Sequence, residues 1–386
     1  MGTLSVADSQ DVFGYLAREL SSLGEKPLSD VDSLALACMS YFRLPEEATA
    51  ARTRRGMPVT DLLRAEWFEP MTRSLWDPDG LVRLLAAVVA SPRLRGMRVS
   101  DYVDVFDEAA EQQFSACVLR LPDGNAYVSF RGTDNTLVGW KEDFNMAFET
   151  GVPSQLAAVE YLDRVARGFK GRLFVGGHSK GGNLAVYAAV NCHKSTFDKV
   201  ERVFSHDGPG FTTEAMAAVD WAERVGKVSK TVPESSMIGM MFERQEDYAV
   251  VRSTQSGVTQ HDPFSWVVED SDFARADEIS AGAGYVDESL NQWVANMSHD
   301  DREGFVNSLF SVLYASGQDT LAGVKSNLSE ALPAMMSAFS QMDGDQRGYL
   351  KQALGGLVRA FMPDVEIPAS LTALMETAGE LQVGQN

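Results

Sequence analysis

The stretch Arg172–Ala188, RLFVGGHSKGGNLAVYA, decides how this chain is expected to fold. An apolar run typical of a strand precedes a serine, and a run of small and apolar residues typical of a helix follows it. Gly177, Gly181 and Gly182 surround Ser179. Because glycine destabilises regular structure and is used where a backbone turns sharply or passes close to another, these glycines predict a tight strand-to-helix turn that exposes the serine.

The residues around Ser179 fit a catalytic motif. Gly177-His178-Ser179-Lys180-Gly181 reads G-x-S-x-G between a strand and a helix, which is the context that a nucleophile elbow requires. The helix that follows an elbow points backbone N–H groups at the place where an anionic intermediate forms. We therefore predict that Ser179 is a nucleophile, and the alternative is a structural turn with an incidental serine. No G-x-x-x-x-G-K-[ST] phosphate loop is present.

Strand-like and helix-like segments alternate on both sides of this turn. Two apolar runs, 113–121 and 126–132, are separated by Pro-Asp-Gly-Asn, which predicts a hairpin. From residue 152 onward a helix precedes the elbow, and the segments after it read strand, helix, strand and strand. This alternation predicts an α/β fold with a mostly parallel central sheet, whose ligands bind beyond the carboxyl ends of the strands.

Helical patterns divide the chain into three expected parts. Residues 1–110 read mostly as helices packed on the core, and their segment 50–75 is either a lid over a site or an aromatic-rich packing segment. Residues 111–285 form the expected α/β core. Residues 286–386 form an expected helical extension with amphipathic runs at 299–315 and 349–362.

Composition narrows the class of protein. The chain has 386 residues and a net charge of −20, which argues against nucleic acid or anionic membrane as the main partner. Its three cysteines show no disulfide framework or metal-ligand spacing, and we expect no metal or cofactor. The N-terminus lacks the pattern of a signal peptide, and no apolar stretch reaches transmembrane length. A cytoplasmic location is therefore expected.

A serine nucleophile needs a base, and one of the five histidines is favoured. In this fold class the chain order is serine, acid, histidine. His261 lies in a loop after the last predicted core strand, where the chain can bend back over the sheet, so we predict that His261 is the base. The other histidines are given other places: His178 supports the turn, His193 closes a helix, His299 begins one, and His206 ends a strand as a minor alternative base.

Two carboxylates compete for the role of the acid that orients the imidazole. Asp207 follows the strand ERVFSH and opens the turn-forming DGPGF, and Glu234 follows the strand KVSKTVP. We favour Asp207 because aspartate is the commoner triad acid, and Glu234 stays the alternative. Each has a purely structural reading, Asp207 as an Asx-turn residue and Glu234 as a helix-start carboxylate.

An oxyanion hole uses two backbone N–H groups, one of them from the residue after the nucleophile. That residue is Lys180, and the second candidate is Thr133, which follows a strand that ends at Phe130. The alternative is a plain strand-to-loop transition in which Arg131 pairs with a carboxylate such as Asp143.

These segments resemble a family of bacterial lipase-like α/β-hydrolases related to class 3 lipases. YVSFRGTDNTLVGWKEDF at 127–144 resembles the class 3 segment that carries the oxyanion residue, and VGGHSKGGNLAVYAA at 175–189 resembles the elbow and its helix. The resemblance covers roughly residues 28–270. It is also carried by the segments VDSLALACMSYF, SHDGPGF, VPESSMIGMMF and QHDPFSW within that range.

The resemblance implies an α/β-hydrolase fold with Ser179 as nucleophile, His261 as base, and Thr133 with Lys180 as oxyanion donors. Class 3 lipases place the acid where this chain has Glu234, whereas SHDGPGF resembles the acid loop of pancreatic-type lipases. Lys180 departs from the apolar residue that lipases often carry at its position.

The residues and the resemblance together predict a serine hydrolase of lipase or esterase type. It would cleave carboxylic esters of small acyl or lipid substrates through an acyl-enzyme. The alternatives are a thioesterase or peptidase-like acyl hydrolase, and a hydrolase-like scaffold that binds a partner through its C-terminal helices.

Overall fold

The computed structural model describes residues 9–149, 151–217, 221–242, 247–280, 298–344, 346–348 and 350. Its centre is an eight-stranded sheet in which strand order follows chain order. Strands β1 to β4 pair antiparallel, and strands β4 to β8 pair in parallel. The strands are β1 (Met57–Pro58), β2 (Arg98–Asp107), β3 (Gln112–Arg120), β4 (Ala126–Phe130), β5 (Leu173–His178), β6 (Val200–His206), β7 (Val228–Pro233) and β8 (Tyr248–Val251). The predicted α/β class and mostly parallel central sheet are confirmed.

The β3–β4 hairpin forms at the predicted turn. The amide of Leu121 donates to the carbonyl oxygen of Asn125 at 2.9 Å. Between them Gly124 adopts a φ of +88°, which is open to glycine and strained for other residues. Asp123 accepts a hydrogen bond from the Asn125 amide at 3.0 Å, so turn chemistry and strand pattern agree here.

Strand β2 adds a long strand to the 1–110 segment, whose other long elements are helices as predicted. It spans Arg98–Asp107 and pairs with β3 along its length. The register shifts between Ser100 and Val103, where Asp101 has a φ of +53°. This irregularity interrupts the period-two alternation by which strands are recognised in sequence. The sheet therefore begins before residue 110.

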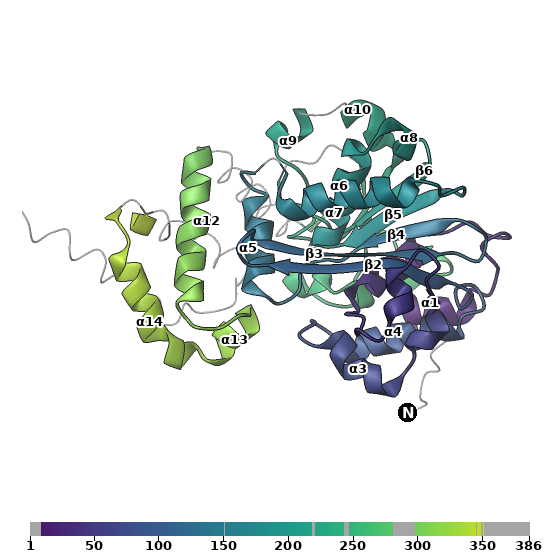
Figure 1. The fold of residues 1–386 in the computed structure, drawn as a ribbon, viewed down its shortest axis with the longest axis horizontal. Coiled ribbons are helices and arrows are strands. Elements are labelled where there is room, and N and C mark those ends of the chain that lie inside the picture. The colour runs from purple at the N-terminus through teal and green to yellow at the C-terminus, as the bar shows by residue number, and fades with distance from the viewer. Residues whose placement is uncertain are drawn as a thin grey trace, which may run out of the picture.

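Most helices of the 111–285 segment cover one face of the sheet, above it in Figure 1. Their apolar side chains meet those of β3 to β6 in one continuous core. This agrees with the helices expected on either side of the elbow. These helices are α6 (Pro153–Ala166), α7 (Lys180–Asn191), α8 (Lys194–Phe197), α9 (Thr213–Ala217) and α10 (Trp221–Arg224), and α5 (Leu137–Asn145) lies at the end of the sheet.

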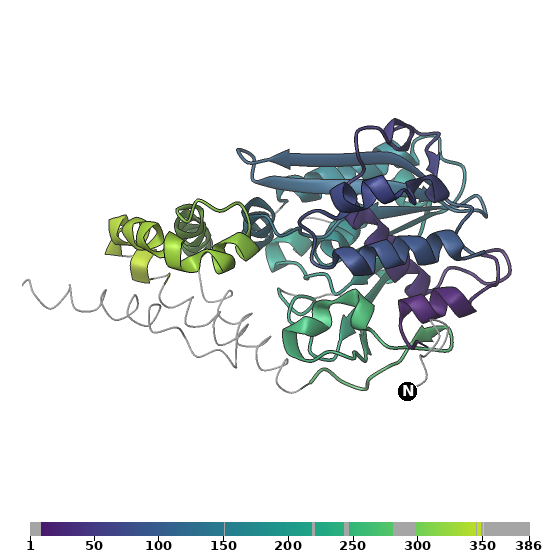
Figure 2. The ribbon, with the colours of Figure 1, turned by 90° about the horizontal axis from the view of Figure 1, so that it is seen from below.

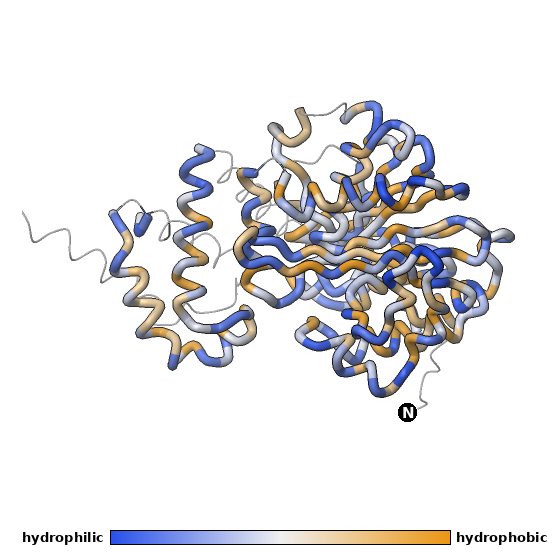
Figure 3. Tube along the Cα trace, viewed as in Figure 1, coloured by the Kyte–Doolittle hydropathy of each residue, from blue (hydrophilic) through white to orange (hydrophobic). Residues whose placement is uncertain are grey.

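N-terminal helices cover the opposite face, and Figure 2 shows them from below. They are α1 (Val12–Arg18), α2 (Asp30–Cys38), α3 (Ala65–Thr72) and α4 (Pro78–Ala90). Helix α2 begins in a capping box formed by Ser29 and Asp32. Arg93 donates to the Asp32 carboxylate at 2.6 Å, and both side chains are fully buried. Figure 3 shows apolar segments through the central strands between these layers.

Short elements complete the described chain. They are the 3-10 helices η2 (Met39–Tyr41), η3 (Thr49–Arg52), η4 (Val59–Leu62), η5 (Val225–Lys227), η6 (Gly257–His261) and η7 (Pro263–Ser265), with a small hairpin of β9 (Val268–Glu269) and β10 (Asp272–Phe273). Part of the N-terminal helical pattern is thus 3-10 rather than α-helix. Elements η6 and η7 form the loop that carries His261.

The C-terminal extension packs against the core through α12 (His299–Tyr314), followed by α13 (Leu321–Ser326) and α14 (Leu328–Gln341). Figure 1 shows these helices beyond α5, at the end of the sheet. Phe310 of α12 is buried and meets the ring of Phe144 edge-on at 5.8 Å. The helix predicted at 299–315 is confirmed, whereas the one predicted at 349–362 and the boundary at 285 lie outside the described residues, apart from residue 350.

Candidate active site

Ser179 lies where β5 ends and α7 begins. Its φ of +59° and ψ of −135° place it in a region that costs a non-glycine residue about 1–3 kcal/mol. A Cβ on Gly177 would lie 2.3 Å from the carbonyl oxygen of Gly181, and a Cβ on Gly181 would lie 2.2 Å from that of Phe130. The glycines are therefore needed because three backbone segments meet at the turn.

A carboxylate and an imidazole meet beyond the carboxyl ends of the neighbouring strands. Asp207 follows β6 with a fully buried side chain, and His261 ends η6. Nδ1 of His261 lies 2.6 Å from Oδ2 of Asp207. The other carboxylate oxygen accepts from the hydroxyl of Ser236. Because a carboxylate only accepts hydrogen bonds, Nδ1 carries the proton, and Nε2 of a neutral ring has a free lone pair.

The backbone N–H groups of Thr133 and Lys180 come from the loop after β4 and from the first turn of α7. Both residues line the same cavity as Ser179 and His261. Within the described parts of the chain, neither amide donates a hydrogen bond to another protein group. Two unpaired N–H groups from two different elements are what an oxyanion hole requires.

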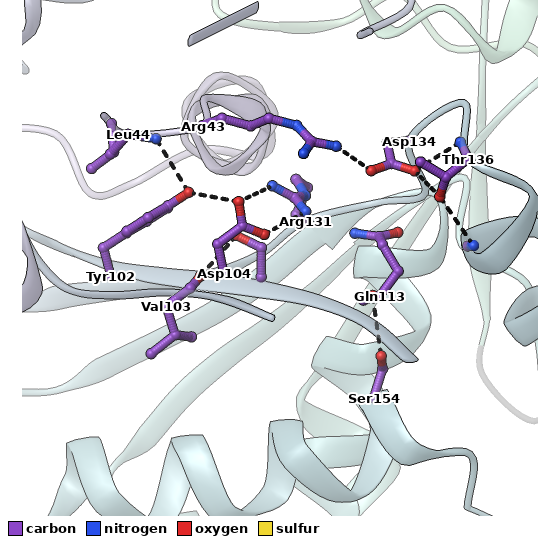
Figure 4. Close-up of polar contacts among 12 residues, drawn as sticks. Arg43, Leu44, Tyr102, Val103, Asp104, Gln113, Arg131, Asp134, Thr136 and Ser154 are labelled. Carbon is purple, nitrogen blue, oxygen red and sulfur yellow. Dashed lines mark hydrogen bonds and ion pairs between the residues drawn. The ribbon is translucent and has the colours of Figure 1, made fainter. Parts of the chain in front are cut away.

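The loop that carries Thr133 is held on one side by β2 (Figure 4). Arg131 is almost fully buried and donates to the carboxylate of Asp104 at 2.7 Å. The hydroxyl of Tyr102 donates to the same carboxylate at 3.1 Å. The partner of Arg131 is therefore Asp104 and not Asp143, since β2 runs beside the loop.

The far end of this loop is held by segments distant in the chain. Arg43 forms an ion pair with Asp134, whose carboxylate also accepts from the amide of Thr136 at 2.9 Å (Figure 4). From the C-terminal extension, the carbonyl oxygen of Asp319 accepts from the amide of Leu137 at 2.8 Å. Side chains and backbone from both ends of the protein thus hold the 131–136 loop.

The side chain of Lys180 points into the protein instead of the cavity. It is fully buried, and its Nζ lies 2.5 Å from the carboxylate of Glu142 and 2.9 Å from the carbonyl oxygen of Gln113. Asp143 is 3.8 Å away and accepts from the hydroxyl of Thr133. Burial raises the pKa of the Asp143 carboxyl to about 7 although Lys180 and Thr133 act against that rise.

Ser179, His261, Thr133 and Lys180 line one cavity of about 440 Å³. Ser179 and His261 face it, and most of the remaining wall is apolar. The lining also includes carboxylates of the 131–136 loop, of α5 and of the His261 loop. The apolar lining residues are Trp76, Trp140, Phe144, Pro209, Ile238, Met241, Phe242, Val258 and Pro263.

Comparison with known proteins places this chain in a family. A family model described as Mbeg1-like matches residues 88–311. The chain belongs to the Mbeg1-like family. It is also similar to solved lipase structures, and no curated protein matches it. The crystal structure of M37 lipase is 12% identical over 55% of this chain and 69% of that one, with a TM-score of 0.36.

A second similar structure is the native propeptide complex of the lipase from Rhizomucor miehei. It is 13% identical over 54% of this chain and 68% of that chain, with a TM-score of 0.29. At such identities the likeness concerns the fold alone. The roles of residues in the Mbeg1-like chain have to be argued from its own geometry.

The alternative acid, Glu234, is held through its backbone at the end of β7 in this Mbeg1-like chain. It follows β7, and its backbone is bonded to Val251 and Ser280. Among the described residues its carboxylate makes no hydrogen bond to His261, and it does not line the cavity. Asp262, the neighbour of His261, instead accepts from the amide of Phe264 within the loop.

The remaining histidines occupy other surroundings. His206 is buried, and its Nε2 lies 2.8 Å from the hydroxyl of Ser33 on the opposite face of the sheet. Burial lowers its pKa to about 3. The side chains of His193 and His299 are 84% and 61% exposed, and neither lines the cavity. His178 does line the cavity, and its two ring nitrogens are hydrogen-bonded to the Tyr41 hydroxyl and to the backbone carbonyl oxygen of His261.

Sequence reasoning missed several polar neighbours of the site. Ser236 donates to Asp207, and Tyr41 contacts His178, but neither belongs to a spaced motif. The available signals were the segment VPESSMIGMMF, which contains Ser236, and the segment VDSLALACMSYF, which contains Tyr41. Within the described residues, no group of three or more His, Cys, Asp or Glu side chains is arranged to hold a metal, and no helix is long and apolar enough to cross a bilayer.

Proposed function

We propose that this protein is a serine hydrolase that cleaves carboxylic esters through an acyl-enzyme. The observation that carries the proposal is the hydrogen bond between Asp207 and Nδ1 of His261, made beside the cavity that the strained Ser179 also lines. A bonded Nδ1 leaves Nε2 available to take a proton, and the strained turn presents the serine to the cavity. Kinship with class 3 lipases is part of this proposal.

In the acylation half-reaction, Nε2 of His261 takes the proton of the Ser179 hydroxyl as the oxygen attacks the ester carbonyl. The carbonyl π electrons move to its oxygen, and the N–H groups of Thr133 and Lys180 stabilise the resulting anion. The tetrahedral intermediate then collapses. The bond to the leaving alcohol breaks, and the alcohol oxygen receives the proton from His261.

In the deacylation half-reaction, His261 takes a proton from water, and the hydroxide oxygen attacks the acyl carbon. Collapse of the second tetrahedral intermediate breaks the bond to Ser179, whose oxygen recovers the proton. Asp207 keeps its charge throughout and stabilises the imidazolium that forms in each half-reaction.

The charges around the cavity favour an uncharged acyl ester. Asp134, Asp143 and Asp262 are among its lining residues, and the Asp134 carboxylate is paired with Arg43. Among its described lining residues Lys180 is the sole lysine or arginine, and its ammonium is tied to Glu142. Together with the net charge of −20, this disfavours polyanionic substrates such as acyl-CoA. Thioesterase and peptidase-like activities remain the alternative substrate classes.

A fluorophosphonate probe tests the proposal directly. We expect the wild-type protein to be labelled at Ser179, with the modified peptide identified by mass spectrometry, and Ser179→Ala to be unlabelled. Asp207→Asn should fold and lower the labelling rate by about 10³–10⁴, because the imidazole loses its correct tautomer. Glu234→Gln is the matched control and should stay near the wild-type rate.

A panel of p-nitrophenyl esters, acyl-CoA and peptide amides then assigns the substrate class. Fast turnover of acyl-CoA would replace the ester proposal by a thioesterase. A folded wild-type protein that is neither labelled nor active on any member of the panel would refute the hydrolase and leave a binding scaffold.

A further inference from the structure

His178, the residue before the candidate nucleophile, has both ring nitrogens engaged. The side chain is buried, Nδ1 lies 2.8 Å from the hydroxyl of Tyr41, and Nε2 lies 2.9 Å from the backbone carbonyl oxygen of His261. The rings of His178 and His261 lie 4.6 Å apart at an interplanar angle of 33°. The elbow therefore contacts the loop of the candidate base through both a hydrogen bond and ring packing.

The chemistry of the partners leaves one proton arrangement. A carbonyl oxygen only accepts, so Nε2 of His178 carries the hydrogen. Burial lowers the pKa of His178 well below its usual value, so the ring is neutral and Nδ1 accepts from the hydroxyl of Tyr41. Burial also raises the pKa of Tyr41 well above its usual value, which keeps that hydroxyl protonated. The order of donation is Tyr41 to His178 to the His261 carbonyl.

Tyr41 also contacts the loop that carries Thr133. A Cβ placed on Gly132 would lie 2.2 Å from the Tyr41 hydroxyl and 2.7 Å from the carbonyl oxygen of His178. The backbone just before Thr133 therefore packs directly against both residues. The Tyr41 ring itself meets Trp76 edge-on at 6.1 Å, which restricts its rotation.

Other bonds hold the His261 loop, but they reach a different part of the protein. Trp266 donates from Nε1 to the carbonyl oxygen of Gln260 at 2.8 Å, and the Gln260 side chain accepts from the amide of Ser235 at 2.6 Å. These contacts tie the loop to itself and to the end of β7. Among the described residues, the bond from His178 is the one hydrogen bond between this loop and the elbow.

We propose that Tyr41 and His178 are positioning residues that set the His261 loop and the 131–136 loop relative to Ser179. The proposal rests on the proposed hydrolase function. Ser179, His261 and Thr133 lie on three separate turns or loops, and this pair touches all three. A displacement of about 1 Å between reacting groups can lower a rate by about 10²-fold, so a shared contact at their junction has a kinetic effect.

The test compares fluorophosphonate inactivation of wild type, Tyr41→Phe, His178→Gln and His178→Leu, corrected for the folded fraction by near-ultraviolet circular dichroism. The control is Tyr127→Phe, another fully buried tyrosine, whose hydroxyl bonds to Ser33 away from the cavity. We expect Tyr41→Phe to lower the maximal inactivation rate about tenfold or more with little change in probe affinity, and Tyr127→Phe to change it less than about twofold.

The conservative variant separates positioning from packing. Glutamine can present an N–H where Nε2 lies, so His178→Gln should keep more of the rate than His178→Leu at equal folded fraction. If wild type is labelled and Tyr41→Phe and His178→Leu both stay within about twofold of it, the positioning role is wrong while the hydrolase stands. If folded wild type is not labelled, the hydrolase itself fails, and the positioning role falls with it.

Discussion

The elbow and the 131–136 loop meet at Ser179 but are held in opposite ways. The elbow depends on missing side chains, because Gly177 and Gly181 let β5, α7 and β4 approach within contact distance. The loop depends on side chains that come from far away in the chain, among them Arg43 and Asp104. The elbow has no room for a side chain at Gly177 or Gly181, whereas the 131–136 loop is held by several separate side-chain contacts.

This difference predicts how the elbow and the loop respond to substitution. A clash with backbone atoms cannot be relieved by a side-chain rotation, so the elbow should fail at a single substitution. The loop should lose stability or rate in steps, as one contact after another is removed. Lys180 connects both, since its backbone belongs to the elbow while its ammonium pairs with Glu142 of α5 next to the loop.

The largest effect is expected for Gly181→Ala. The new Cβ would lie 2.2 Å from the carbonyl oxygen of Phe130, so strand β4 or helix α7 must move. We expect the free energy of unfolding to fall by about 4 kcal/mol or more, or no folded protein to be obtained. Gly226→Ala, whose Cβ would meet no atom within 4 Å, is the control and should change it by less than about 0.5 kcal/mol. Equal denaturation midpoints for the two variants would contradict the close approach.

The next effect is expected for Lys180→Met. It leaves the Glu142 carboxylate buried without its cation, which should lower the free energy of unfolding by about 3 kcal/mol. The double variant Lys180→Met with Glu142→Gln should recover part of the loss, because the buried charge is then gone. Denaturant unfolding of both single variants and the double variant measures the coupling, and additive losses would show that the pair does not link elbow and loop.

A smaller, pH-dependent effect is expected for Asp143→Asn. Between about pH 4 and pH 7 the Asp143 carboxyl is ionised in the unfolded state but still protonated in the folded state. The free energy of unfolding of the wild type therefore falls as the pH rises through this range. The melting temperature of the variant relative to wild type should therefore increase from pH 4 to pH 8. The free energy of unfolding of the variant should exceed that of wild type by about 1–2 kcal/mol at the upper end of this range. The difference is modest because the Asp143 side chain is 22% exposed and solvent screens its charge. A difference that is flat or falls with pH would mean that the carboxyl is ionised throughout.

The smallest effect is expected for Thr133→Val. The hydroxyl of Thr133 donates to Asp143, and valine keeps the backbone N–H that is proposed to face the oxyanion. We therefore expect the fluorophosphonate labelling rate to fall no more than about tenfold, with stability changed by about 1 kcal/mol. A loss of about 10² or more at unchanged stability would instead make the hydroxyl itself the donor.

Several features of the fold follow from local sequence. The strand-like apolar runs of β3 and β4 and the turn between them predict the hairpin, and the apolar strand followed by glycines predicts the β5–α7 turn. Strand β2 was not predictable in this way, because the shift at Ser100 and Asp101 disturbs its alternation and its pairing partner lies further along the chain. The helical pattern at 299–315 predicts α12 but not that Phe310 packs on Phe144.

The sequence by itself determined the sheet class, the turn at Ser179 and a short set of polar residues at strand ends, because each depends on neighbours a few positions apart. It left Asp207 and Glu234 as competitors, since both follow a strand of the same sheet. Only the tertiary structure decided that the carboxylate of Asp207 contacts His261, that Arg131 pairs with Asp104, and that Tyr41 reaches His178. These are contacts between segments far apart in the chain, and packing rather than spacing brings them together.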